Sequence, residues 1–132
     1  MKLSVLFKRI QHAVIQMPEL EEEMEIRGIT CNSQKAEEDS LFVCIQGVSS
    51  DGHDFAAAAL EKGAAAVVCQ RDLGLENQVL VPDTHQAYGK IAANFYGNPA
   101  QKLKLIGVTG TKGKTTVTSL IKAILTRTGQ KV

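Results

Sequence analysis

Short apolar runs alternate with helical segments along the chain from residue 41 onward. The apolar runs at residues 41–45, 64–69 and 79–81 have the length and composition of buried strands. Residues 55–62, between the first two runs, and residues 84–96, after the third, predict helices. Strands that alternate with helices predict an α/β fold in which at least part of the sheet is parallel.

Local signals mark where the two predicted helices begin and end. Asp54 is placed to cap the first helix, and Gly63 follows its last residue. Asp83 is placed to cap the second helix, with Gln86 three residues later as in a capping box. Gly97-Asn-Pro99 then breaks the chain and predicts a domain boundary.

The first 40 residues have weaker patterns. Residues 3–12 predict a helix with one buried face, because four apolar residues recur at helical spacing: Leu3, Leu6, Phe7 and Ile10. The acidic stretch at residues 19–25 predicts a solvated connector. Residues 26–31 predict a short strand. Residues 32–40 and 47–52 predict loops.

Composition narrows the class of protein. The 132 residues are 44% hydrophobic, enough for one compact domain but short for two. Fifteen basic and 14 acidic residues leave a net charge of +1, which argues against a nucleic-acid partner. No apolar run approaches the roughly 20 residues of a membrane-spanning helix, so we expect no membrane insertion. The three cysteines, Cys31, Cys44 and Cys69, predict buried reduced thiols in a cytoplasmic protein.

The clearest chemical signal is the glycine-rich segment Gly107-Val-Thr-Gly-Thr-Lys-Gly-Lys-Thr-Thr116. Residues 103–106 precede it as a predicted strand, and residues 117–127 follow it with helical periodicity. Strand, glycine-rich turn, Gly-Lys-Thr and helix form the layout of a phosphate-binding loop. In such a loop backbone N–H groups surround the anion, Lys114 reaches the outer phosphates and Thr115 ligates Mg²⁺.

This loop departs from the strict pattern G-x-x-x-x-G-K-[ST], whose first glycine would fall at Val108. A glycine-rich turn that binds nothing is the alternative. The departure is informative, because Thr109 to Thr116 matches T-G-T-x-G-K-T-[TS], the loop of the Mur ligase family, which builds the peptide of bacterial peptidoglycan. That family usually has Asn at x. Here Lys112 either adds charge near the terminal phosphate or is solvated.

Upstream segments resemble the same family, in order and spacing. They are Asn32-Ser-Gln34, Leu41-Phe-Val-Cys-Ile-Gln-Gly47, Asp51-Gly-His-Asp-Phe55, Gly63-Ala-Ala-Ala-Val-Val68 and Phe95-Tyr-Gly-Asn-Pro99. The family patterns run roughly D-S-R, L-F-V-A-x-x-G, D-G-H-x-F and G-A-x-A-V-V. The resemblance covers about residues 24–132 and is strongest to the Mur ligases that add the third residue of the stem peptide. Ligases that add the final dipeptide share less of it.

The resemblance implies two parts. Residues 1–98 would form a UDP-MurNAc-substrate-binding domain with a mixed sheet flanked by helices. Residues 99–132 would begin a truncated ATP-binding central domain, with its first strand, P-loop and helix. Substrate-binding residues would be Ser33, Val48, Ser49 and Ser50. ATP-binding residues would be Gly110, Thr111, Lys112, Gly113, Lys114, Thr115 and Thr116, with Lys114 catalytic and Thr115 on Mg²⁺.

The implied activity is an ATP-dependent ligation. ATP phosphorylates the D-glutamate carboxylate of UDP-MurNAc-L-Ala-D-Glu, and the amine of L-lysine or meso-diaminopimelate attacks the acyl phosphate. The family's remaining metal-binding residues and its amino-acid-binding domain come later in sequence, so we expect this chain alone to have no ligase activity. The alternatives are a fragment of the dipeptide-adding ligase, a stand-alone nucleotide-sugar binding module, and a different P-loop enzyme such as a kinase.

Some residues have simpler interpretations. Asn32 and Gln34 replace the Asp and Arg of D-S-R, so a salt bridge between them is lost, and Ser33 could also be a turn or capping serine. We expect Asp51 to form a turn and His53 to cap or pack beside the next helix. His12 and His85 are expected at the surface. The apolar face of the helix at 115–128 should dock on the first domain, pair with another copy of the chain, or be mobile. We therefore expect a monomer, or weak self-association through this face.

Overall fold

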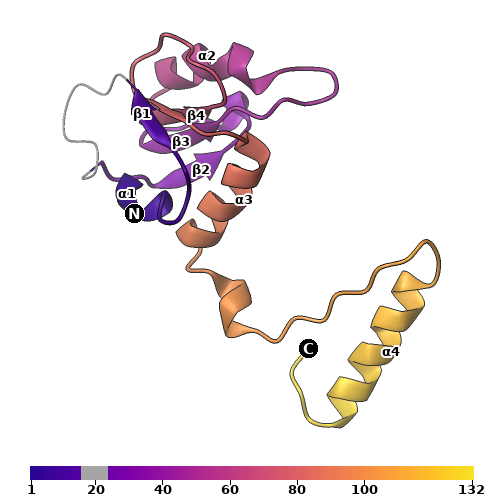
Figure 1. Ribbon diagram of the computed structural model, residues 1–132. Helices are drawn as coiled ribbons and strands as arrows, with labels where there is room; N and C mark the ends of the chain where they lie inside the picture. Colours follow the sequence, from indigo (N-terminus) through magenta and orange to yellow (C-terminus); the bar gives the residue numbers. More distant parts are fainter. Residues whose placement is uncertain (16–23) are drawn as a thin grey trace. The chain divides into compact units, whose positions relative to one another are not determined.

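The computed structural model describes residues 1–15 and 24–132, and the side chains of all of these except Val14 and Ile15. The chain forms two compact units, Met1–Pro99 and Ala100–Val132 (Figure 1). The first unit is an α/β domain built on one sheet, and the second contains one long helix. Across the described ranges, no helix combines the length and the apolarity that crossing a membrane requires.

The sheet of the first unit has the strand order β1-β5-β4-β3-β2. Its strands are β1 (Ala13–Ile15), β2 (Gly28–Thr30), β3 (Ser40–Val43), β4 (Ala66–Cys69) and β5 (Gln78–Leu80). Strands β2 to β5 are parallel, which confirms the predicted parallel sheet. Strand β1, which sequence patterns missed, pairs antiparallel with β5 and makes the sheet mixed.

Hydrophobic layers lie on both faces of the sheet. In β3, Leu41 and Val43 face one cluster while Phe42 faces the other, as the alternation of a strand requires. Helices α1 (Leu3–Leu6) and α3 (Thr84–Phe95) contribute Leu6 and Ile91 to the first cluster, and α2 (Ala56–Glu61) contributes to the second. These runs are apolar throughout because both faces of the central strands are covered.

The helix predicted at residues 3–12 is wrong in length. Helix α1 ends at Leu6, and Arg9 adopts a left-handed φ of 63°, which a continuing α-helix does not allow. The four apolar residues expected on its buried face are all buried nonetheless: Leu3, Leu6, Phe7 and Ile10. Most of the predicted acidic connector lies outside the described residues. Glu25, at its end, bonds the N-terminal ammonium at 2.6 Å.

Helices α2 and α3 lie where the sequence predicts them, and one of their two predicted caps is confirmed. Asp83 caps α3 by accepting a hydrogen bond from the backbone N–H of Gln86 at 3.0 Å. Asp54 does not cap α2, which is the prediction that was wrong. The chain instead enters α2 through the 3₁₀ helix η3 (Gly52–Phe55), and Asp51 caps that element. A further 3₁₀ helix, η2 (Ser33–Lys35), lies within the predicted loop after β2.

The cysteine prediction is confirmed at two positions and wrong at the third. Cys44 and Cys69 are buried, and burial is the main cause that raises their pKa values to about 12 and about 11. Cys31 is exposed, because β2 is an edge strand that ends at Thr30 and the cysteine follows it into the loop.

The 3₁₀ helix η4 (Pro99–Lys102) crosses the boundary between the units in sequence. The second unit continues with an extended segment, the glycine-rich loop and helix α4 (Lys114–Arg127) (Figure 1). Helix α4 confirms the predicted helix. The strand predicted at residues 103–106 is wrong: the segment pairs with no neighbouring strand in the described part of the chain. An apolar run becomes a strand only when another strand satisfies its backbone groups, so extended residues alone do not suffice.

Candidate functional site

The glycine-rich loop delivers the chain directly into the N-terminus of α4. Gly113 precedes the helix with φ of 79°, and Gly110 has φ of 147°; both are conformations that favour glycine. No side chain caps α4 within the described structure. The first helical N–H groups, those of Lys114 to Thr116, therefore lack the partner that Asp83 gives to α3, and they carry the positive end of the helix dipole.

The side chains at this helix end suit an anionic ligand. Lys112 and Lys114 are both exposed. The hydroxyl of Thr118 is occupied by the carbonyls of Lys114 and Thr115, both at 2.9 Å. Among the described residues, the hydroxyls of Thr115 and Thr116 have no hydrogen-bond partner, which leaves them able to bind a ligand. Free amides, two cations and free hydroxyls fit a polyphosphate and an accompanying Mg²⁺.

Helix α4 keeps most of its apolar face exposed. Leu120 and Ile124 are 59% and 61% exposed. Only Ile121 and Leu125 are half-buried, because the extended segment at residues 104–108 lies along the helix and lines a cavity with them. The docking, pairing or mobility predicted for this face stays a prediction.

The second candidate site lies in the first unit, where the parallel strands end. Carboxyl ends of parallel strands meet at one edge, which is where α/β sheets commonly bind ligands. The segment after β3 forms a short hairpin, residues 45–52, closed by the bonds Gly47 N–H to Ser50 O (2.7 Å) and Gly52 N–H to Ile45 O (2.8 Å). Its tip carries three predicted substrate residues, Val48, Ser49 and Ser50, all exposed.

Ser33 lies in η2, which follows β2, the strand next to β3 in the sheet. The Ser33 carbonyl accepts a hydrogen bond from Lys62 Nζ at 3.0 Å, which ties η2 to α2. Its hydroxyl has no partner among the described residues. Asn32, not Ser33, is the capping residue, because Asn32 Oδ1 accepts from the backbone N–H of Gln34 at 2.9 Å.

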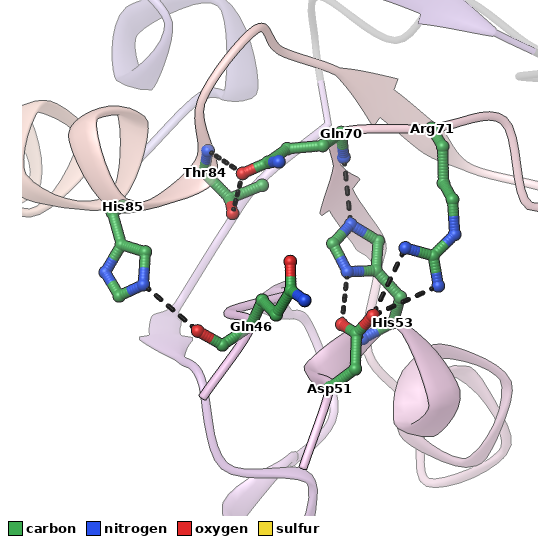
Figure 2. A network of polar contacts seen from close by, with 7 residues as sticks. All are labelled: Gln46, Asp51, His53, Gln70, Arg71, Thr84 and His85. Atoms are coloured by element: carbon green, nitrogen blue, oxygen red, sulfur yellow. Dashed lines mark hydrogen bonds and ion pairs between the residues drawn. The ribbon is translucent and has the colours of Figure 1, made fainter. Parts of the chain in front are cut away.

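Behind the hairpin, polar side chains from three segments form one network (Figure 2). Asp51 Oδ1 accepts from the backbone N–H of His53 at 3.0 Å and from its ring Nδ1 at 2.6 Å. The opposite ring nitrogen, Nε2, accepts from the backbone N–H of Gln70 at 3.0 Å. Nε2 therefore carries no proton, and the ring proton lies on Nδ1. Gln70 Oε1 in turn accepts from the N–H and the hydroxyl of Thr84, both at 2.9 Å.

Asp51 is the charged centre of this network. Its bonds from the backbone N–H and the ring of His53, with Arg71 Nη1 and Nη2 at 3.2 Å from Oδ2, hold the pKa of the carboxyl at about 2. The prediction that Asp51 forms a turn and that His53 caps or packs beside the following helix did not include the contacts that these two side chains make with Gln70 and Arg71. The side chain of His53 is only 1% exposed and joins two segments that are far apart in sequence.

Sequence reasoning missed the partners of these residues. Gln70 and Arg71 carried one usable signal, since polar residues that directly follow a buried strand lie at its carboxyl end. Thr84 carried none beyond its place at a helix start. His85 is exposed as predicted, yet its Nε2 lies 3.3 Å from the Gln46 carbonyl at the base of the hairpin. His12 is exposed too.

Comparisons with known proteins agree on one family. The model of the Mur ligase family, described as its catalytic domain, matches residues 25–96. A UDP-N-acetylmuramoyl-L-alanyl-D-glutamate–2,6-diaminopimelate ligase from Syntrophomonas wolfei is 43% identical over 129 residues, which are 96% of this chain and 26% of that protein. The chain thus spans about a quarter of the length of the curated relatives it matches.

Solved structures give the same picture. A crystal structure of MurF from Acinetobacter baumannii superposes with a TM-score of 0.72 at 30% identity, covering 96% of this chain and 27% of that one. MurF ligase from Thermotoga maritima in complex with ADP superposes with a TM-score of 0.57 at 32% identity, covering 76% of this chain and 23% of that one.

Proposed function

Because the chain belongs to the Mur ligase family, we propose that it is the N-terminal part of an ATP-dependent ligase of peptidoglycan synthesis in the cytoplasm. The reaction would add the third amino acid to UDP-MurNAc-L-Ala-D-Glu. The observation that carries the proposal is the presence of two loops with free polar groups. One is the exposed hairpin at the carboxyl edge of the sheet, and the other is the glycine-rich loop that leads into the uncapped N-terminus of α4. The relative from Syntrophomonas wolfei is named for that substrate and supports the choice.

In this proposal the domain at residues 1–98 holds the UDP part of the substrate. Ser33 and the hairpin tip at Val48, Ser49 and Ser50 supply hydroxyls and backbone amides, which suit a uracil edge or diphosphate oxygens through neutral hydrogen bonds. Exposure of the tip and the unpartnered Ser33 hydroxyl support this role. Val48 is 110% exposed, and an apolar side chain held in solvent is available to cover a flat ligand surface.

The segment at residues 99–132 would bind ATP. Backbone amides from Gly110 to Thr116 surround the phosphates, and Lys112 and Lys114 add positive charge to the outer ones. Thr115 would be a ligand of Mg²⁺, which supplies charge neutralisation during phosphoryl transfer. The described residues hold no cluster of three carboxylate, imidazole or thiol ligands, so Thr115 is the metal ligand that this proposal assigns to the chain. The MurF ligase structure from Thermotoga maritima is a complex with ADP, which supports a nucleotide as a ligand of this chain.

The chemistry of the proposed ligase places few demands on this chain. Lys114 positions the phosphoryl group that passes to the D-glutamate carboxylate, and the acyl phosphate then reacts with the amine of L-lysine or meso-diaminopimelate. ADP, phosphate and the UDP-MurNAc-tripeptide leave. We expect the 132-residue chain by itself to bind UDP-substrate without turnover, since it spans about a quarter of its relatives. Steady ATP- and amino-acid-dependent phosphate release by this chain would contradict that expectation.

Calorimetric titrations of the chain test both sites. UDP-MurNAc-L-Ala-D-Glu should release heat with the wild-type chain and with Lys114→Met, because that substitution lies in the nucleotide loop. Ser33→Ala should weaken binding about tenfold, the cost of one hydrogen bond. Mg-ATP should show the reverse pattern, with binding weakened by Lys114→Met and unchanged by Ser33→Ala. No heat with UDP-MurNAc-L-Ala-D-Glu at millimolar concentration would refute the substrate assignment.

A fragment of the dipeptide-adding ligase is the second candidate, favoured by the superposition on MurF from Acinetobacter baumannii. The same titration separates the two candidates, because that ligase takes a tripeptide nucleotide. A higher affinity for UDP-MurNAc-tripeptide than for UDP-MurNAc-dipeptide would favour it. Binding of UDP-substrate without any binding of ATP would instead favour a stand-alone nucleotide-sugar module.

A further inference from the structure

The hairpin at residues 45–52 has little to hold it in place besides polar contacts. Its residues from Gln46 to Ser50 are all exposed, and Ile45 at its start is the hairpin residue that packs against the first hydrophobic cluster. A two-stranded hairpin of this size is marginal in water when nothing else supports it. Three contacts join the base of the hairpin to other segments of the unit (Figure 2). The backbone N–H of Gln70 donates to His53 Nε2, the Arg71 guanidinium pairs with the Asp51 carboxylate, and His85 Nε2 lies beside the Gln46 carbonyl.

These three contacts differ in strength. The side chain of Arg71 is 55% exposed, and exposed ion pairs contribute about 0–1 kcal/mol. The His85 contact is long, at 3.3 Å, and exposed. The imidazole of His53 is 1% exposed, and its two bonds are 2.6 Å and 3.0 Å long. A buried donor or acceptor that loses its partner is costly, so the His53 contacts dominate.

We propose that His53 is a positioning residue that fastens the substrate-binding hairpin to the end of β4. One ring nitrogen, Nδ1, donates to Asp51 at the end of the hairpin, and the other, Nε2, accepts from the backbone N–H of Gln70. The side chain of Gln70 continues the connection to Thr84 at the start of α3. These contacts fix the position of the hairpin, and so of its tip, relative to β4 and α3. This inference rests on the proposed function for the role of the tip.

Two substitutions at His53 each remove the contact of one ring nitrogen and keep that of the other. In His53→Asn the amide nitrogen takes the place of Nδ1 and keeps the bond to Asp51, but nothing accepts from Gln70. In His53→Gln the amide oxygen takes the place of Nε2 and keeps Gln70, but Asp51 loses its ring donor. Asp72→Asn is the matched control. Its carboxylate accepts from Gly74 and Gln78 in the loop that follows β4, without touching the hairpin.

The first measurement is amide hydrogen exchange at Gly47 and Gly52, whose N–H groups close the hairpin. We expect at least tenfold faster exchange at both amides in His53→Asn and His53→Gln, with the amides of β4 unchanged. Asp72→Asn should leave the hairpin amides at wild-type rates. This measurement needs no ligand, so it tests the fastening even if the proposed function fails.

The second measurement is calorimetric affinity for UDP-MurNAc-L-Ala-D-Glu, at a temperature where circular dichroism shows every variant folded. We expect about tenfold weaker binding in both His53 variants and wild-type binding in Asp72→Asn. Unchanged exchange at Gly47 and Gly52 in both His53 variants would overturn the proposal, as would equal losses in Asp72→Asn. Absence of binding by the wild-type chain would refute the proposed function and leave the exchange rates to decide the role of His53.

Discussion

Gly52 stands where the hairpin backbone passes closest to itself, and replacing it gives a sharp test of the described geometry. A Cβ at this position would lie 2.6 Å from Ile45 N and 2.8 Å from Ile45 O, distances that real Cβ atoms essentially never show. Gly52 is not among the glycines with positive φ, so close approach rather than backbone conformation requires glycine here. Gly52→Ala must therefore push the two sides of the hairpin apart.

The cost follows from two contributions. Forcing a methyl group into a closed space costs about 1–3 kcal/mol. The bond from Gly52 N–H to Ile45 O, 2.8 Å long, is lost with it, at about 0.5–1.5 kcal/mol. Together these lower the free energy of unfolding of the first unit by roughly 1.5–4.5 kcal/mol, and the Tm by at least about 6 °C for a unit of this size.

Gly89→Ala is the matched control, because the same methyl group there meets nothing within 4 Å. Gly89 lies inside α3, so alanine should raise stability by about 0.5–1 kcal/mol through helix propensity. Thermal unfolding of both variants, followed by circular dichroism, measures the contrast. A Tm of Gly52→Ala within about 2 °C of wild type would refute the close approach at the hairpin.

Three further predictions follow from single residues. Asp83→Ala should lower the free energy of unfolding by about 1 kcal/mol in urea titrations, and Asp83→Asn much less, because only alanine removes the cap of α3. The folded pKa of Asp51, about 2, lies below the usual value of about 3.9, so its carboxylate stabilises the fold above pH 4 and loses this effect as the pH falls to 2. The stability difference between wild type and Asp51→Asn should therefore shrink over that range, and a constant difference would contradict the network. Iodoacetamide should label Cys31 in the folded chain, and Cys44 and Cys69 only after unfolding, as mass spectrometry can show.

Much of the fold could be predicted from local patterns. The parts of the predicted apolar runs that lie in β3 and β4, residues 41–43 and 66–69, are apolar at every position because helices cover both faces of the sheet. The cap at Asp83 and the start of α4 after Gly113 depend on residues next to one another in sequence. Residues 103–106 show the limit of this reasoning. They are apolar enough for a strand, but a strand needs a partner that composition does not supply.

The candidate site divides in the same way. The sequence by itself determined the glycine-rich loop, since its amides, lysines and hydroxyls are contiguous and the helix that follows orients them. It also determined the resemblance to the Mur ligase family, which the comparisons confirm. Only the tertiary structure decided that His53 joins Asp51 to Gln70, because the contact between His53 and Gln70 spans 17 residues and depends on the pairing of β3 with β4. A site made of neighbouring residues can be recognised from the sequence, whereas contacts between distant segments form only when the sheet has set the register of its strands.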